Sequence, residues 1–169
     1  SWVICDDTSS TGNYSRARYN ANIPSTFPAD KVLWTEITLK YEGQIAPLGW
    51  EYDMARSPIH IAADGTIYRF GRWAYNSTEN DQPYESGTPL EYKLNPGRWY
   101  TIAVALDFTA DTDGTGAPLY VWVNGTQIAA GTDKVSELCS SGSFKYVDLW
   151  IDQVTNGNAT VSIDSFKCY

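Results

Sequence analysis

Hydrophobic and polar residues alternate with a period of two over many short segments of the chain. In residues 32–41, Leu33, Ile37 and Leu39 fall on one side of an extended chain, and Trp34 falls on the other. This alternation is typical of a strand with one buried face. The same pattern recurs in residues 50–55, 59–61, 66–70, 99–108, 119–123, 127–130, 147–151 and 161–166. It predicts an all-β chain.

Turn residues separate the predicted strands. The Asp-Gly pair at residues 64–65 and the Asn-Gly pair at 124–125 predict tight hairpins, and Asn-Pro-Gly at 95–97 predicts a turn. We expect a long polar loop over residues 74–91, and no helix beyond one short turn in residues 133–139. Ten or so strands joined in this way predict a two-sheet antiparallel β-sandwich, or jelly roll.

Size, charge and aromatic content narrow the class of protein. The chain has 169 residues, which fits a single domain over residues 1–169. Its formal charge of −8 argues against nucleic acid, whose phosphates need a basic face, and also against a polyanionic glycan unless a local basic patch overrides it. There is no apolar run of membrane-spanning length, so we expect no membrane insertion. Aromatic residues make up 14% of the chain, and they serve either as a β core or as rings that stack on sugars. We expect no organic cofactor.

Three segments carry a resemblance to a known superfamily. Residues 97–104 read Gly-Arg-Trp-Tyr-Thr-Ile-Ala-Val, and residues 119–125 read Leu-Tyr-Val-Trp-Val-Asn-Gly. This resembles a back-sheet strand and hairpin of laminin-G-type members of the concanavalin A-like lectin/glucanase superfamily. The closing Val-Ser-Ile-Asp-Ser-Phe at 161–166 is similar to the ending of many bacterial jelly-roll modules. The resemblance implies a concanavalin A-like sandwich whose concave sheet cradles a glycan. That fold hosts lectins, glycosidases and lyases alike.

The polar sides of the predicted strands, and the loop that follows residues 66–70, mix acids with aromatic and basic residues. Rings can stack on sugars, and charged carboxylates accept strong hydrogen bonds from hydroxyls. The competing interpretation is that the rings fill the core and the acids are simply solvated. The candidate sugar-binding residues are Glu51, Asp53, His60, Arg69, Trp73, Tyr75, Trp122, Asp148, Trp150 and Asp152.

These residues predict a secreted carbohydrate-binding domain, lectin-like or of the carbohydrate-binding-module type. Its expected partner is a polysaccharide or glycan, and it could belong to a larger multidomain enzyme. Four Asn-Xaa-Ser/Thr sequons, at residues 13, 76, 124 and 158, favour secretion.

An enzyme using the same groove is the alternative hypothesis. Glu51 and Asp53 resemble the start of the glucanase Glu-x-Asp-x-x-Glu strand, but Arg56 stands where its last acid would be, which argues against a retaining glycosidase. A polysaccharide lyase is the better enzymatic candidate. His60 would be the base, and Tyr68 would supply a phenol. The substrate carboxylate would meet Arg56, Arg69, Lys40 or Arg72. A strand histidine without a catalytic role is the simpler interpretation of His60.

A structural calcium ion is a further expectation. By analogy with jelly-roll modules, it would lie between Asp6 or Asp7 and Asp164. The loop with Asp111 and Asp113 is an alternative, because alternating acids begin many calcium loops. An ordinary hairpin loop explains that pair equally well.

Three cysteines allow one disulfide and one free thiol. If the first and last strands pair antiparallel, Cys5 and Cys168 lie near opposite ends of the pair, too far apart to bond. We therefore expect Cys139–Cys168, with Cys5–Cys139 as the remaining possibility.

Overall fold

The computed structural model contains twelve strands and one short helix over the residues that it describes. The described residues are 2–7, 15–19, 32–43, 48–52, 56–61, 64–72, 88–110, 117–135, 147–151 and 158–168. The strands are β1 (Trp2–Asp7), β2 (Ser15–Tyr19), β3 (Val32–Gly43), β4 (Leu48–Tyr52), β5 (Arg56–Ile61), β6 (Thr66–Arg72), β7 (Thr88–Lys93), β8 (Trp99–Asp107), β9 (Ala117–Val123), β10 (Thr126–Val135), β11 (Val147–Ile151) and β12 (Asn158–Cys168). A single 3-10 turn, η1 (Phe108–Ala110), follows β8.

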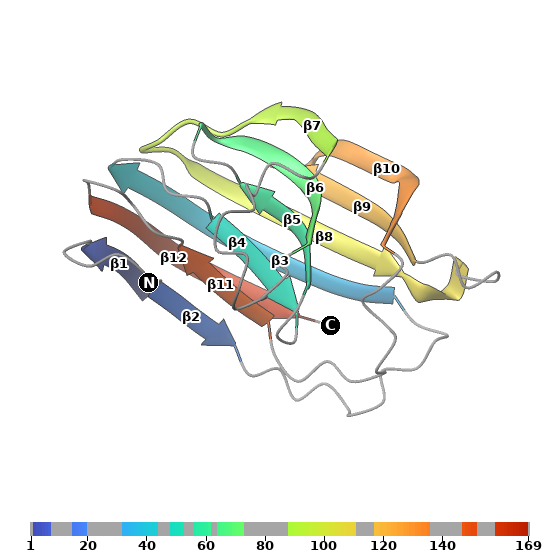
Figure 1. The fold of residues 1–169 in the computed structure, drawn as a ribbon, viewed down its shortest axis with the longest axis horizontal. Helices are drawn as coiled ribbons and strands as arrows, with labels where there is room; N and C mark the ends of the chain where they lie inside the picture. Colours follow the sequence, from blue (N-terminus) through green and yellow to red (C-terminus); the bar gives the residue numbers. More distant parts are fainter. Residues whose placement is uncertain are drawn as a thin grey trace, which may run out of the picture.

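The strands form two six-stranded antiparallel sheets. Sheet A has the order β1-β12-β3-β8-β9-β10, and sheet B has the order β2-β11-β4-β5-β6-β7. The sheets stack face to face as two layers (Figure 1). Strands β1 and β2 lie together at one edge, and β7 and β10 lie together at the other. This is the two-sheet sandwich that the alternating pattern predicts.

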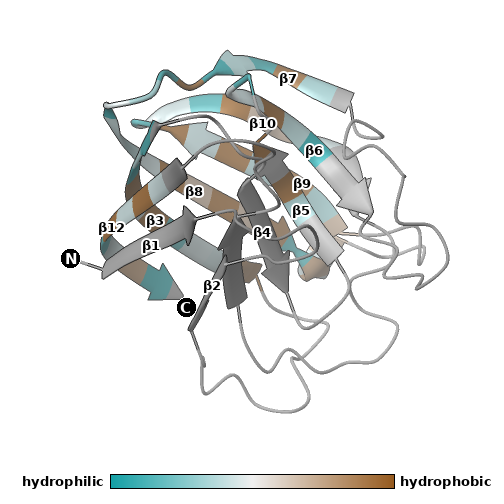
Figure 2. Ribbon diagram, turned by 60° about the vertical axis from the view of Figure 1, so that its left-hand side comes forward, coloured by the Kyte–Doolittle hydropathy of each residue, from teal (hydrophilic) through white to brown (hydrophobic). Residues whose placement is uncertain are grey.

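The core lies between the two sheets and follows the period-two pattern. In sheet A, Ile37, Ile102 and Val121 are completely buried, and in sheet B, Ile59 and Ile67 are completely buried. All five belong to one hydrophobic cluster. Hydrophobic segments recur along β3, β8 and β9 in Figure 2. The residues that alternate with them therefore lie on the outer faces of the sandwich, because successive strand residues point to opposite faces.

The turns predicted from the sequence are present, and their glycines have the positive φ angles that such turns need. Gly65 and Gly125 have φ of 87° and 79°, and Asn124 also has a positive φ of 49°. These values suit the tight hairpins that join β5 to β6 and β9 to β10. The expected turn at residues 95–97 ends in Gly97, with φ of 75°.

The strand expected over residues 99–108 ends at Asp107, and Phe108 begins the 3-10 turn η1, where we expected no helix. Two further sequence predictions need correction. The polar loop expected over residues 74–91 ends sooner, because Thr88 begins β7. Residues up to Val135 continue β10 as a strand, where we expected a short helical turn from residue 133. In both cases pairing with a neighbouring strand, β6 or β9, decides the conformation, and the local pattern does not display that pairing.

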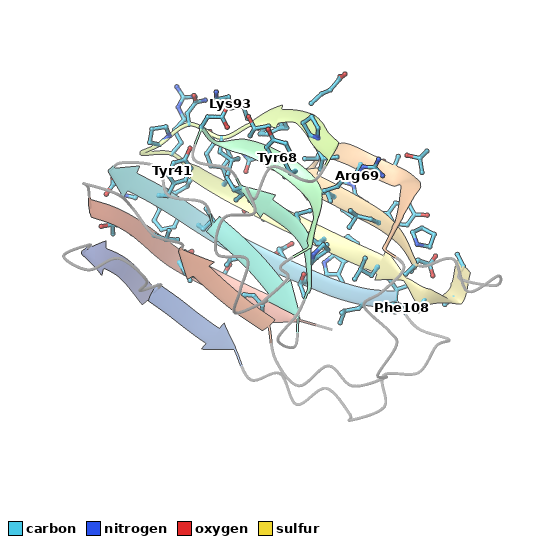
Figure 3. All side chains as sticks on the ribbon, in the orientation of Figure 1. Tyr41, Tyr68, Arg69, Lys93 and Phe108 are labelled. Carbon is cyan, nitrogen blue, oxygen red and sulfur yellow. The ribbon has the colours of Figure 1, made fainter. Side chains whose placement is uncertain are left out.

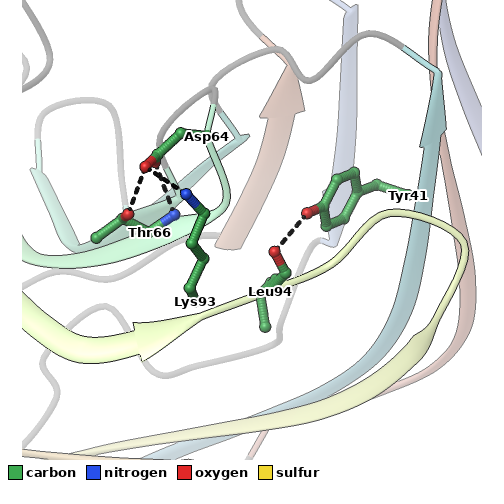
Figure 4. Close-up of polar contacts among 5 residues, drawn as sticks. All are labelled: Tyr41, Asp64, Thr66, Lys93 and Leu94. Carbon is green, nitrogen blue, oxygen red and sulfur yellow. Dashed lines mark hydrogen bonds and ion pairs between the residues drawn. The ribbon is translucent and has the colours of Figure 1, made fainter.

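A polar contact network holds one end of the sandwich (Figure 4). Asp64 accepts hydrogen bonds from the backbone N–H and hydroxyl of Thr66, both at 2.9 Å, and pairs with the Lys93 ammonium at 2.9 Å. The buried Tyr41 hydroxyl donates to the carbonyl of Leu94 at 3.0 Å. These contacts connect β3 of sheet A with the β5–β6 turn and the end of β7 in sheet B.

Candidate functional site

One cross-strand row of sheet B contains several of the predicted sugar-binding and catalytic residues. His60 of β5 pairs with Gly49 of β4 on one side and with Tyr68 of β6 on the other. Gly49 pairs in turn with Trp150 of β11, which pairs with Arg16 of β2. We call Arg16, Trp150, Gly49, His60 and Tyr68 the histidine row. Directly paired residues share a face of the sheet, so the register brings these five positions together.

The histidine row lies on the outer face of sheet B. Ile59, Ile61 and Ile67 flank it along β5 and β6, and all three belong to the core cluster between the sheets. Tyr68, which is labelled in Figure 3, is half-buried and follows the fully buried Ile67, so it stands on the opposite side of β6. Gly49, at the centre of the row, has no side chain between the positions of Trp150 and His60.

A second row on the same face adds charged positions. Asp148 of β11 pairs with Glu51 of β4 and with Arg18 of β2. These residues stand two positions from Trp150, Gly49 and Arg16 on their strands, so they share the face of the histidine row. Farther along, Arg56 of β5 pairs directly with Arg72 of β6. Like charges placed directly opposite each other are unfavourable unless something neutralises them.

The two sheets differ in charge. Five of the six arginines of the chain lie on strands of sheet B, whose strands carry six basic and three acidic residues, an excess of three positive charges. The strands of sheet A carry three basic and seven acidic residues, an excess of four negative charges. A chain with a net charge of −8 therefore presents one locally basic sheet.

The register separates two predicted site residues from the histidine row. Trp122 lies on β9 of sheet A, between the fully buried Val121 and Val123, so its ring is on the outer face of the other sheet. Arg69 pairs with Ile59, which faces the core, so it stands on the side of β6 opposite to Tyr68. Alternation within each strand could not reveal either result, because it does not say which strands share a sheet.

Other predicted residues lie outside the described parts of the chain, and their roles stay predictions. These residues are Asp53, Trp73, Tyr75, Asp152, Asp111, Asp113 and Cys139.

The register between β1 and β12 shows how far Asp164 lies from Asp6 and Asp7, the residues expected to hold a calcium ion. Asp6 pairs with Ala159, and Asp7 pairs with Asn158. Asp164 lies five positions farther along β12 than Ala159, or roughly 16 Å along a strand. That separation is too long for Asp6 or Asp7 to share one ion with Asp164, since each oxygen must lie within about 2.6 Å of calcium. No metal-binding group of three or more His, Cys, Asp or Glu occurs among the residues that the structure describes.

The same pairing bears on the cysteines. Strands β1 and β12 are antiparallel, as assumed from the sequence, and Cys5 pairs with Thr160. Cys168 lies eight positions away, roughly 26 Å along the strand, which excludes a Cys5–Cys168 bond. The Cys139–Cys168 disulfide stays a prediction.

Sequence reasoning missed two residues of the site, Arg16 and Arg18. A signal for them exists, because Ser-Arg-Ala-Arg-Tyr at β2 places both arginines on one side of an extended chain. The segment is short and lacks the apolar alternation that marks the other strands. Its pairing with β11 is therefore what identifies it as part of this face.

Comparisons with known proteins address the fold. No protein-family model matches the chain, and no curated protein matches it significantly in sequence. A structure of botulinum neurotoxin type C, described for its interaction with two ganglioside molecules, matches with a TM-score of 0.58 at 12% identity. That match covers 99% of this chain and 38% of the toxin chain, so this chain spans well under half of that protein.

Two further structures belong to other classes. An endo-β-1,4-glucuronan lyase from the fungus Trichoderma reesei matches with a TM-score of 0.57 and 11% identity, over 98% of this chain and 78% of the lyase. A galectin from Caenorhabditis elegans matches with a TM-score of 0.51 and 11% identity, over 88% of this chain and 90% of the galectin. Identities this low show a shared fold alone.

The chain therefore has the concanavalin A-like jelly-roll fold that the sequence resemblance implies. Proteins that share the fold include carbohydrate-binding lectins, a toxin binding domain and polysaccharide lyases. The described residues contain no helix long and apolar enough to cross a membrane.

Proposed function

We propose that this protein binds an acidic polysaccharide across the outer face of sheet B. The observation that carries the proposal is the register, which places four arginines on the face of sheet B that carries the histidine row: Arg16, Arg18, Arg56 and Arg72. Arginine suits repeated carboxylates because its planar guanidinium can donate two parallel hydrogen bonds to each one. A polymer of uronic acids presents such carboxylates at regular intervals, and its uncharged sugar faces can stack on aromatic rings.

The pair formed by Arg56 and Arg72 supports an anionic ligand specifically. Their direct pairing across β5 and β6 places two positive residues opposite each other, which is unfavourable unless an anion neutralises them. An anion bound between them would remove that repulsion. Arg16 and Arg18 provide a second basic group at the β2 edge, where they pair with Trp150 and Asp148. A ligand crossing the strands from β2 to β6 would meet positive charge at both ends.

Secretion is part of this proposal. The four sequons support it, as does the usual extracellular location of acidic polysaccharides.

The test is a binding comparison with a matched control. Polymannuronate, polyglucuronate and a neutral glucan would be titrated by calorimetry against the wild-type chain, Arg56→Gln and Arg98→Gln. Arg98 is the sixth arginine, and it is exposed in the turn between β7 and β8, outside sheet B. We expect Arg56→Gln to weaken binding of a uronate polymer about tenfold, because a charged hydrogen bond contributes about 1.5–3 kcal/mol. Arg98→Gln should have no effect. Equal losses in both variants, or no uronate binding by the wild type, would contradict the proposal.

A second candidate function is β-elimination on the same polymer, and the direct pairing of His60 with Tyr68 favours it. In this reaction a base removes the proton from the carbon beside the uronic carboxylate. The bond to the glycosidic oxygen then breaks, a carbon–carbon double bond forms, and the leaving oxygen takes up a proton from an acid. His60 and Tyr68 are a base and an acid of suitable type, and an arginine would stabilise the charge that develops on the carboxylate.

Absorbance separates the two candidates. Elimination creates a conjugated double bond that absorbs ultraviolet light, whereas binding does not. A rise in absorbance with any uronate polymer, lost in His60→Ala, would assign a lyase. Binding without such a rise would assign a carbohydrate-binding domain.

A further inference from the structure

The outer face of sheet A carries a cluster of three aromatic rings. Trp34 of β3 lies with its ring centroid 4.9 Å from that of Trp122 on β9, at an interplanar angle of 35°. The rings of Trp122 and Tyr120 are 6.1 Å apart and nearly parallel, at 17°. We call these three residues the aromatic platform. All three are half-buried, and their neighbours along the strands face the core.

The strands beneath the platform have small residues where the rings need space. Ala105 of β8 pairs with both Trp34 and Tyr120, and Ala103 pairs with Trp122. Both alanines are on the outer face, yet they are only 3% and 7% exposed. Ala105 has a large ring on each side, and Ala103 has Trp122 on one side and Glu36 on the other. These large neighbours are consistent with the burial of both alanines.

Gly131 of β10 serves the same purpose beside Tyr120. A Cβ atom built at Gly131 would lie 2.5 Å from Cζ, 2.6 Å from the hydroxyl oxygen and 2.7 Å from Cε1 of Tyr120. Two neighbouring ring atoms and the attached hydroxyl oxygen at nearly equal distances mean that the plane of the phenol lies flat against the glycine backbone. Only glycine permits this approach.

Polar groups border the platform, and their charges cancel. One cross-strand row runs from Lys167 through Glu36, Ala103 and Trp122 to Gln127. Lys167 and Glu36 form an ion pair at 2.6 Å, and Gln127 is exposed. The row therefore offers hydrogen-bonding groups on both sides of an uncharged aromatic surface. The negative excess of sheet A would repel a polyanion, so the chemistry differs from that of sheet B.

We infer that the aromatic platform is a second glycan-binding site, for a neutral polysaccharide with a flat, β-linked chain. Tyr120 and Trp122 are nearly parallel, and Trp34 packs against Trp122 at a tilt. Aromatic faces of this kind match the flat C–H faces of sugars, and the polar border can bond to the hydroxyls at their edges. The inference does not depend on the proposed function of sheet B, because the two surfaces are on opposite sides of the sandwich. It places Trp122 in a glycan site, but in one separate from His60.

The experiment measures retention of the purified chain on insoluble cellulose and its retardation by soluble hydroxyethylcellulose in native gels. We expect Trp122→Ala to weaken retention at least tenfold. The matched control is Trp99→Ala, because Trp99 is 47% exposed on the same face of sheet A but pairs with Lys40, away from the platform. Retention should persist in Trp99→Ala and in His60→Ala. A loss in His60→Ala would assign the neutral glycan to sheet B and overturn the inference.

A second variant guards against misfolding of Trp122→Ala. Ala130 is exposed and pairs with Tyr120, so Ala130→Arg should fold and obstruct the platform. We expect it to weaken cellulose retention by a similar factor, with an unchanged circular dichroism spectrum. If no neutral glycan is retained by the wild type, or if Ala130→Arg instead dissociates a dimer seen by light scattering, the platform is not a glycan site.

Discussion

His60 of β5 and Tyr68 of β6 are direct cross-strand partners at the centre of sheet B. The two residues are only eight positions apart in the chain, joined through the hairpin at Gly65. The position of any catalytic pair therefore depends on a local hairpin, whereas the arginines around it come from β2, β5 and β6. Because His60 and Tyr68 are direct partners, substitutions at these two residues can distinguish a binding domain from a lyase.

Tyr68→Phe tests the role of the phenol. The variant keeps the ring and removes only the hydroxyl, so the half-buried side chain should still pack and the fold should remain. If the site is a lyase, turnover should fall by about 10²–10⁴-fold, the usual contribution of a general acid or base. Initial rates of ultraviolet absorbance on polyglucuronate, with calorimetric affinity measured in parallel, give the result. A proportional loss of affinity and turnover would mean that the hydroxyl only binds substrate.

Gly65→Ala should destabilise the protein strongly. Gly65 has φ of 87°, and a Cβ atom there would clash with the backbone carbonyl oxygen of Leu94. Gly97 is the control, because it has a similar φ of 75° but open space around its Cβ position. We expect Gly97→Ala to cost about 1 kcal/mol, the penalty of left-handed backbone alone. Gly65→Ala should cost about 2–3 kcal/mol more in urea unfolding, because overpacking adds to that strain. Equal costs would refute the clash.

The buried hydroxyl of Tyr41 predicts a stability change at high pH. Burial, with smaller contributions from Tyr100 and Asp64, raises the pKa of Tyr41 to about 12. Since the pKa is near 10 in the unfolded chain, this group's contribution is complete below about pH 10 and is lost as the pH rises towards 12. Tyr41→Phe should remove this pH dependence and cost about 1–3 kcal/mol at neutral pH, because the carbonyl of Leu94 loses its donor. Urea unfolding at a series of pH values measures both effects.

Asp64 predicts a smaller change at low pH. Hydrogen bonds from Lys93 and Thr66 lower the pKa of Asp64 to about 2. A lowered pKa means that the contribution is present above about pH 4, where the unfolded carboxyl is ionised, and is lost as the pH falls towards 2. The side chain is 57% exposed, so screening should limit the effect to below about 1 kcal/mol. Lys93→Gln should reduce the acid-induced loss, measured by thermal unfolding between pH 5 and 2; an identical pH profile would show that the ion pair contributes nothing.

Gly131→Ala tests whether the contact between Gly131 and Tyr120 contributes to both the stability of the fold and glycan binding by the aromatic platform. The new methyl group would collide with the Tyr120 ring, so the ring must move off β10 or the strand must shift. Gly125 is the control, since its φ of 79° resembles the 77° of Gly131 and nothing lies near its Cβ position. We expect Gly131→Ala to cost about 1–3 kcal/mol more than Gly125→Ala. It should also weaken retention on cellulose, and retention equal to that of Gly125→Ala would exclude a flat Tyr120 ring as part of the site.

The strands and turns could be predicted from the sequence because their signals are local. The alternation through Leu33, Ile37 and Leu39 identifies β3 and its buried face, and the Asn124–Gly125 pair identifies the β9–β10 hairpin. A period of two is an unavoidable consequence of extended backbone, so one buried face leaves a visible pattern. The resemblance in residues 97–104 and 119–125 predicted that the sandwich is concanavalin A-like, and the fold comparisons confirm this.

The arrangement of the candidate site depends on which strands pair with each other, and local sequence patterns do not show that pairing. Trp122 and Trp150 look alike in the sequence, since both are aromatic residues that alternate with apolar neighbours. Only the strand order places Trp122 on sheet A and Trp150 on sheet B. The sequence by itself determined the strands, the hairpins and their buried faces. The tertiary structure alone decided that the arginines gather on one sheet and the platform rings on the other, because contacts between distant strands are chosen by packing of the whole core.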